Sequence, residues 1–184
     1  MAFGACIFGF QTCCRPAIAT NRTHLKGKCK GVLFIALTMD GNDHIFPIAF
    51  GVTDIKNDRS WTWFLREAYN VIGSPRDLII ISDRHISIKN TDANVFPNVA
   101  HGLCGFHMKN NISNTYKNSH VTTLFVNASR VYRKDEFIGL MKVLKVVKPK
   151  AHDKLIDNDV CKWSLAYYLV RRYSLITVEC GDRA

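Results

Sequence analysis

The sequence lacks acidic residues over its first 39 positions, where five arginine and lysine residues occur. No apolar run approaches the ~18 residues that a membrane-spanning helix needs, so we expect no membrane partner. The apolar start has no basic residue ahead of it, which argues against a signal peptide. Internal repeats and low-complexity tracts are also missing, and an apolar content of 47% is typical of globular proteins rather than disordered ones.

The seven cysteines lack the pattern of a disulfide framework, because their number is odd and no secretory signal precedes them. We interpret them as reduced thiols. A length of 184 residues allows a sizeable hydrophobic core and suggests a single domain.

What the chain has in excess is positive charge, with 25 basic and 15 acidic residues and a formal net charge of +10. Residues 105–184 contribute most of this excess, since they contain 14 basic and 7 acidic residues. A polyanion partner is therefore expected, and nucleic acid is the commonest polyanion. The alternative is a basic protein whose charge serves only its solubility.

The pattern of apolar residues predicts an α/β fold whose sheet has about five strands, the first three antiparallel. An Asp-Gly pair between the second and third strands predicts a hairpin, and Pro47 predicts that the third strand lies at a sheet edge. The predicted strands are residues 16–20, 32–39, 44–52, 78–82 and 99–104.

Helical periodicity predicts a helix with an apolar face from Trp61 to Ile72, and we expect Trp61 in the core rather than in a base-stacking platform. A short helix is expected to end at Phe96. From residue 104 onwards the pattern is helical, with one apolar stripe that begins at Phe137 and another that begins at Trp163.

One carboxylate follows a predicted buried strand, in which Leu78–Ile81 lead through Ser82 to Asp83. Open α/β sheets bind ligands at such strand ends. The crossover to this strand is expected to be right-handed, and with Pro47 at the edge the vacant parallel neighbour is the first strand. That strand is predicted to end at Asn21, so Asn21 should lie beside Asp83. The alternative role of Asp83 is to cap a helix that follows.

Several separate segments occur in an order and spacing that resemble those of one protein family. They are RPAIATNRTHLKGKCKG, DGNDHIFPIAFGVTDIKNDRSWTWFL, ISDRH, FPNVAHGLCGFHMKNN, KWSLAYY and RRYSLIT, and they extend from Arg15 to Thr177. The family is the plant-type transposases of Mutator-like elements (MULEs), whose catalytic core is RNase H-like. The resemblance implies a catalytic-domain fragment for DNA transposition by metal-dependent strand cleavage and transfer.

The resemblance also implies three acidic residues that hold two divalent metal ions, Mg²⁺ or Mn²⁺. Asp83 matches the second acid. The first acid is replaced by Asn21, and Arg22 adds a positive charge next to it. The third acid should follow RRYSLIT, where Asp182 fits the spacing better than Glu179. The resemblance therefore implies an inactive enzyme with weak or absent metal binding.

A basic turn follows the first predicted strand and is expected to bind DNA phosphates, with glycines that let the backbone approach closely. The residues predicted to contact DNA are His24, Lys26, Lys28, Lys30 and Arg84. The alternative is a solvated basic turn without a ligand.

Cys104 and His107 match a Cys-x-x-His motif of the family and are predicted to share a helix face. Such a pair could supply half of a zinc site, with His101 and His85 as candidates for the remaining ligands. We favour a structural role, in which a buried thiol and a hydrogen-bonded histidine brace the core.

The predicted organisation is a poorly defined segment at 1–14, an RNase H-like core at 15–118 and a helical part at 119–184. The alternative to a transposase fragment is a domesticated, non-catalytic DNA-binding or nuclear regulatory module. A nuclease acting on RNA hybrids shares the metal chemistry, but the transposase-like motifs and the missing first acid argue against it. We expect DNA as the partner, a homo-oligomer and a nuclear location.

Overall fold

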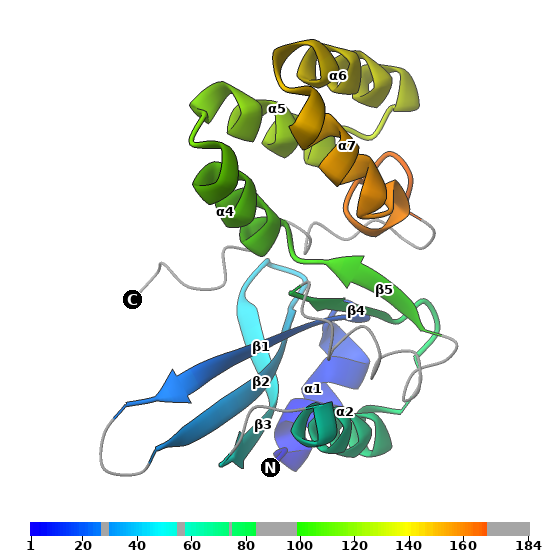
Figure 1. Ribbon diagram of the computed structural model, residues 1–184. Coiled ribbons are helices and arrows are strands. Elements are labelled where there is room, and N and C mark those ends of the chain that lie inside the picture. Colours follow the sequence, from blue (N-terminus) through cyan, green and yellow to red (C-terminus); the bar gives the residue numbers. More distant parts are fainter. Residues whose placement is uncertain (27–29, 55–57, 74, 84–98, 169–184) are drawn as a thin grey trace. The chain divides into compact units, whose positions relative to one another are not determined.

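The computed structural model describes residues 1–26, 30–54, 58–73, 75–83 and 99–168. The chain divides into two compact units (Figure 1): the sheet unit, Met1–His101, and the helical unit from Gly102 onwards. Within the described ranges, no helix is long and apolar enough to cross a membrane. The short helix that the sequence predicts before Phe96 lies outside the described residues.

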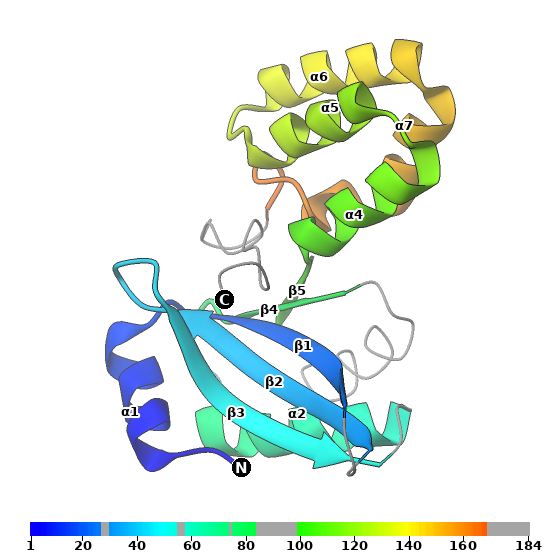
Figure 2. The same cartoon turned by 90° about the vertical axis from the view of Figure 1, so that its left-hand side faces the viewer.

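The sheet has five strands in the order β3-β2-β1-β4-β5 (Figure 2). β1 pairs antiparallel with β2 and β2 with β3, whereas β1 and β4 are parallel. The strand that contains Pro47 is an edge strand, as expected for a residue that cannot donate a hydrogen bond to a neighbour. The strands are β1 (Ala17–Leu25), β2 (Gly31–Met39), β3 (Ile45–Thr53), β4 (Ile79–Ser82) and β5 (Ala100–Leu103).

The predicted hairpin between β2 and β3 is confirmed, and Asp40 organises its turn. The Asp40 Oδ1 atom accepts hydrogen bonds from the backbone N–H groups of His44 at 2.9 Å and Asn42 at 2.8 Å. These bonds lower the pKa of the Asp40 carboxyl because they stabilise its charged form, and the bond from His44 has the largest effect. Asp43 has a left-handed φ of 67°, a conformation that aspartate tolerates in turns.

β1 is longer than the sequence predicts, which corrects the expected position of Asn21. The strand continues to Leu25 instead of ending at Asn21, and its pairing with β2 extends to Leu25 opposite Gly31. The polar residues from Asn21 to His24 conceal this extension, because they lack the apolar–polar alternation that is typical of a half-buried strand. Asn21 is therefore internal to a strand, and β1 and β2 leave only residues 26–30 between them for the predicted basic turn.

β4 is buried on both faces, as its run of apolar residues predicts. Ile79, Ile80 and Ile81 are each only 2% exposed, and Ser82 is fully buried. Such enclosure is typical of a strand that lies between other strands of a sheet and is covered on both sides. The backbone leaves this enclosed position at Asp83, which is the first residue after β4.

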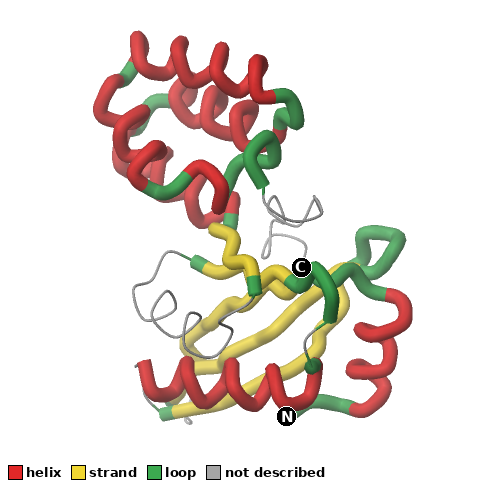
Figure 3. The backbone as a smooth tube through the Cα atoms, turned by 90° about the vertical axis from the view of Figure 1, so that its right-hand side faces the viewer, coloured by secondary structure: helices red, strands yellow, loops and turns green. Residues whose placement is uncertain are grey.

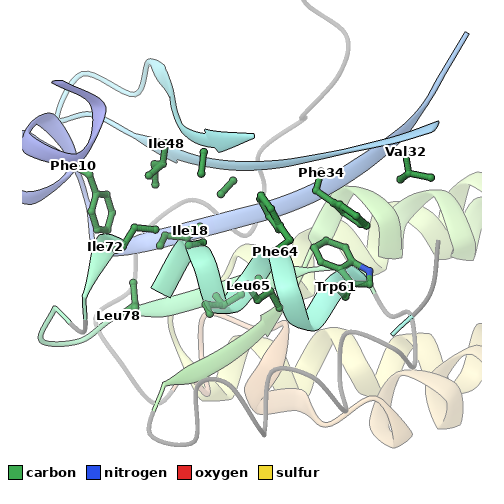
Figure 4. Close-up of a cluster of buried hydrophobic side chains, with 14 residues drawn as sticks. Phe10, Ile18, Val32, Phe34, Ile48, Trp61, Phe64, Leu65, Ile72 and Leu78 are labelled. Atoms are coloured by element: carbon green, nitrogen blue, oxygen red, sulfur yellow. The ribbon is translucent and has the colours of Figure 1, made fainter. Parts of the chain in front are cut away.

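Helices α1 (Gly4–Cys13) and α2 (Asp58–Ile72) lie on one face of the sheet (Figure 3). Their apolar side chains meet those of β1, β2 and β3 in a single cluster (Figure 4). At its centre the Phe34 ring lies 4.6 Å from the Trp61 ring and 5.5 Å from the Phe64 ring, measured between centroids. Trp61 is 1% exposed, which confirms its predicted place in the core.

The first fourteen residues are ordered, whereas the sequence predicts a poorly defined segment. They form α1, whose Phe10 is buried in the core cluster. Ahead of the helix, Ala2 pairs with Ala49 of the edge strand, and the Phe50 N–H donates to the Met1 carbonyl at 2.9 Å. Contact with the sheet orders this segment, and its own weak amphipathic pattern does not reveal that contact.

Within its described residues, the helical unit packs four helices and a short 3₁₀ turn around a second apolar core. Trp163 lies at its centre, with its ring 5.4 Å from that of Phe125 and 5.6 Å from that of Phe137. The predicted stripe that begins at Phe137 is buried there. The elements are α4 (Gly105–Tyr116), α5 (Ser119–Arg130), α6 (Lys134–Val147), α7 (Pro149–Asp157) and the 3₁₀ turn Val160–Lys162.

Two expectations about the helical part need correction. The predicted boundary at 118 would assign α4 to the sheet, but Met108 and Ile112 of α4 pack into the core of the helical unit. Residues 163–168 form turns instead of the predicted helix. The Leu165 N–H donates to the Ser129 carbonyl at 3.1 Å, and this contact with α5 replaces the bonds of a helix.

Replacing each of two glycines by alanine should change the free energy of unfolding in opposite directions. A Cβ on Gly51 of β3 would lie 2.7 Å from Phe64 Cδ2, so Gly51→Ala should lower the free energy of unfolding by about 1–3 kcal/mol. Gly139 of α6 has no neighbouring atom within 4 Å of such a Cβ, so Gly139→Ala should raise it by up to about 1 kcal/mol. Denaturant titration measures both, and a stable Gly51→Ala variant would contradict the close packing of α2 on β3.

Candidate active site

The parallel pairing of β1 with β4 brings Asn21 and Asp83 to the same part of the sheet. Ala17, Ile18 and Ala19 pair with Ile79, Ile80 and Ile81, and this register, if continued by two residues, would set Asn21 alongside Asp83, although β4 itself ends at Ser82. Neighbouring strands are ~4.8 Å apart, so the two backbones are close at this level. The adjacency that the sequence predicts from the crossover is therefore consistent with the observed register.

The Asn21 side chain makes a local hydrogen bond. Its Oδ1 atom accepts from the backbone N–H of Arg22 at 2.8 Å. An amide oxygen carries no formal charge, and here one of its lone pairs is already engaged. Asn21 is therefore a weaker metal ligand than the carboxylate that the resemblance implies for this position.

Arg22 extends toward Asp83 and lies over the core tryptophan. Its Nη2 atom is 3.7 Å from the Asp83 Oδ2 atom, and its guanidinium is 5.9 Å from the centroid of the Trp61 ring. The side chain of Arg22 is 11% exposed and that of Asp83 is 26% exposed. The guanidinium is thus largely enclosed between an aromatic ring and a carboxylate.

The electrostatics of Arg22 follow from this enclosure. Burial lowers the pKa of the Arg22 guanidinium, and the charge of Asp83 opposes that effect. Because the ordinary pKa of arginine lies far above neutrality, the group stays protonated at neutral pH. Its Nη1 atom is buried and has no hydrogen-bond acceptor among the described residues. The ring of Trp61 offers it a cation–π contact instead.

The described residues do not fit the divalent metal ion that the family implies. Among the described residues, Asp83 is the one carboxylate at this place, Asn21 is neutral, and a metal ion held by Asp83 would lie beside the positive Arg22. Across the described ranges, no group of three or more His, Cys, Asp or Glu side chains is arranged to hold a metal ion. Glu179 and Asp182, the candidates for the third acid, lie outside those ranges.

The Cys-x-x-His pair lies at the start of α4, where Cys104 is the N-cap residue and His107 belongs to the first turn. Burial raises the pKa of the Cys104 thiol, but hydrogen bonding to His107 and the charge of that histidine outweigh burial, so the pKa is lowered. His101, one proposed zinc ligand, has its Nε2 atom 2.8 Å from the Ser82 hydroxyl. The other, His85, lies outside the described residues.

Some of the residues predicted to contact DNA lie on the strand pair β1–β2 and its turn. His24 belongs to β1 rather than to a loop, and it is exposed, as are Lys26 and Lys30 at the ends of the turn. Lys28 and Arg84 lie outside the described residues. The exposed side chains are therefore free to meet a solvent-borne polyanion, which is consistent with their predicted role.

Sequence reasoning missed the contact partners of Arg22. In a strand, Arg22 points to the same face as Ile18, toward α2, whereas Asn21 points to the opposite face. The available signal in the sequence was the alternation of side chains between the two faces of β1. This alternation sets Arg22 on the face that α2 covers, and α2 contains Trp61. Its approach to Asp83 arises because Asp83 has left β4, and that departure has no signature in the sequence.

Comparison with known proteins identifies the family of the chain. The MULE transposase domain matches residues 18–111, just over half of the chain, and the matched region runs from β1 into α4. The chain therefore belongs to the MULE transposase domain family. No curated protein matches it.

Among solved structures, the chain is similar to a chain of the cryoEM structure of the simian T-cell lymphotropic virus intasome in complex with PP2A regulatory subunit B56 gamma. The sequence identity is 11% and the TM-score is 0.37. The similarity covers 91% of this chain and 60% of that chain.

Proposed function

We propose that the chain is part of a plant-type MULE transposase catalytic domain with an RNase H-like core, which binds DNA and no longer cuts it. The observation that carries the proposal is the family match across β1–β5, at whose centre Asp83 is paired with Arg22, the residue that follows Asn21. The mixed sheet, with three antiparallel strands followed by a parallel one, supports the RNase H-like assignment.

Loss of cutting is supported by the chemistry of the site. Two-metal cleavage stabilises the attacking and the leaving oxygen of an in-line phosphoryl displacement, and hard metal ions need several oxygen ligands. Only one of the family's acids, Asp83, is retained at the described positions. A non-catalytic, domesticated regulator fits the same features. The transposase fragment and the regulator would both act on DNA in the nucleus. Self-association of the chain is a further part of this proposal.

DNA binding is supported by the distribution of charge. The first 39 residues carry five basic side chains and no acidic one, and the exposed His24, Lys26 and Lys30 belong to this stretch. Phosphate contacts from such side chains position a protein on DNA without reading its sequence. The expected binding is thus weak, with little sequence preference and a dissociation constant of roughly 10⁻⁴–10⁻⁶ M at physiological salt.

The test is a titration of labelled duplex DNA at several salt concentrations. The affinity should fall steeply with salt, because each phosphate contact releases a counterion. Lys26→Gln with Lys30→Gln should weaken binding and reduce the salt slope by about 2, close to ~0.9 per lost contact.

A matched control removes two charges that are already paired. Arg133 contacts Asp135 at 2.6 Å, and Lys162 lies 3.9 Å from Asp159. Arg133→Gln with Lys162→Gln changes the net charge equally and should change the salt slope much less. Binding that is independent of ionic strength, or equally affected by both pairs of substitutions, would refute the proposed interface.

A further inference from the structure

We propose that the guanidinium of Arg22 takes the place of a divalent cation beside Asp83. Arg22 and Asp83 then form an ion pair that needs no metal ion. The inference deepens the proposed loss of catalysis and names its cause. A consequence is that restoring the missing acid at position 21 does not by itself restore a metal site. Arg22 must be removed as well.

The first support is the location of the pair. Arg22 belongs to β1 and Asp83 follows β4, the strand that runs parallel to β1. Their closest charged atoms are 3.7 Å apart. The cation therefore links two adjacent strands where they diverge, which is where a metal ion held by carboxylates on both strands would act.

The second support is the enclosure of the cation. Arg22 is only 11% exposed, and one side of its guanidinium lies over the Trp61 ring. Trp61 is itself 1% exposed and belongs to the core cluster, so the ring is a fixed support. A planar guanidinium is suited to such stacking, and lysine would not reproduce it.

The third support is the charge balance. Asp83 carries one negative charge, and Arg22 neutralises it in place. A divalent ion that approached Asp83 would meet the repulsion of an enclosed positive charge that cannot lose its proton at neutral pH. At such short range this repulsion is similar in size to the attraction by Asp83, so the ion pair offers a metal ion little net electrostatic attraction while Arg22 is present.

The competing interpretation is that Arg22 is an incidental neighbour that would swing away when a metal ion arrives. Its enclosure argues against this, since departure would expose an aromatic ring and leave the guanidinium to find another partner. The two interpretations differ in what Asn21→Asp alone should do. An incidental arginine would permit metal binding in that variant, whereas a substitute cation would prevent it.

The experiment compares Mn²⁺ binding by the full chain, by Asn21→Asp, and by Asn21→Asp with Arg22→Met. Methionine keeps an apolar stem over Trp61 while removing the charge. Calorimetric titration should detect no saturable site in the first two chains. The double variant should bind Mn²⁺ at least roughly tenfold more tightly than Asn21→Asp, and its Tm should rise with Mn²⁺ concentration.

Equal Mn²⁺ affinity of Asn21→Asp and the double variant would overturn the proposal, as would a rise in the Tm of the unmodified chain with Mn²⁺. No DNA is present, so failure here is distinguishable from a failure of DNA binding. If the double variant does not fold, Arg22→Met, Asp83→Asn and their combination provide a second test by thermal denaturation.

In this second test, Asp83→Asn should lower the Tm because it leaves an enclosed cation without its carboxylate. The same change in the Arg22→Met background should have a clearly smaller effect. Additive changes in Tm would show that the two side chains are not coupled, which would overturn the ion pair.

Discussion

Duplex or supercoiled DNA incubated with the purified chain and Mg²⁺ or Mn²⁺ should remain uncut. Metal ions contribute several kcal/mol of transition-state stabilisation to strand cleavage, and each ~1.4 kcal/mol corresponds to a tenfold change in rate. A site with a neutral Asn21 and a positive Arg22 beside Asp83 forgoes most of that stabilisation. A rate reduced by roughly a thousandfold or more is below detection in an ordinary nicking assay.

The control for this expectation is Asp83→Ala. If cleavage by the unmodified chain were robust and were lost in Asp83→Ala, Asp83 would be a working catalytic acid and the proposed inactivity would be wrong. Traces of activity that persist in Asp83→Ala would instead come from a contaminating nuclease. Asn21→Asp should also leave the DNA uncut, because Arg22 still neutralises Asp83.

Much of the sheet could be predicted because its signals are local. The buried run that leads to Asp83 is typical of an enclosed strand, and Pro47 argues against a central position for its strand. The order of strands then follows from the handedness of one crossover, and the predicted adjacency of Asn21 and Asp83 rests on that order.

Other features depend on tertiary contacts that leave no local pattern. The continuation of β1 through polar residues to Leu25 depends on its partner β2, and α1 depends on the sheet beneath it. Residues 163–168 carry a helical pattern, yet their backbone bonds to α5. Each case is one in which packing outweighs local propensity.

The candidate site also combines features that the sequence indicates locally with features that depend on tertiary contacts. The resemblance implies that Asn21 and Asp83 stand at two metal-ligand positions of the family, which stays a prediction, and the sequence sets a positive residue next to Asn21. They do not reveal that Arg22 lies over Trp61 and reaches the neighbouring strand, since both contacts require the packing of α2 under β1. The contacts of Arg22 depend on how β1, β4 and α2 pack together, and no single sequence motif specifies them.

Trp163→Ala should disrupt the helical unit more than any exposed substitution. The side chain is fully buried, its ring touches those of Phe125 and Phe137, and its Nε1–H donates to the Leu155 carbonyl at 3.2 Å. Truncating a buried tryptophan costs about 3–5 kcal/mol, which is a large share of the ~5–15 kcal/mol that stabilises a typical domain. Far-ultraviolet circular dichroism should therefore show a marked loss of helix or a much earlier unfolding transition.

Two further variants test how the ring contacts and the hydrogen bond of Trp163 contribute to the destabilisation by Trp163→Ala. Trp163→Phe keeps most of the ring contacts but removes the hydrogen bond, and the Leu155 carbonyl that loses its donor accounts for about 1–3 kcal/mol. Trp63→Ala serves as the matched control, because Trp63 is 45% exposed and a surface truncation usually changes the free energy of unfolding by about 0.5 kcal/mol or less. If Trp163→Ala were no more destabilising than Trp63→Ala, Trp163 would not be the centre of the second core, and the helical unit would have to be stabilised mainly by contacts that do not involve this ring.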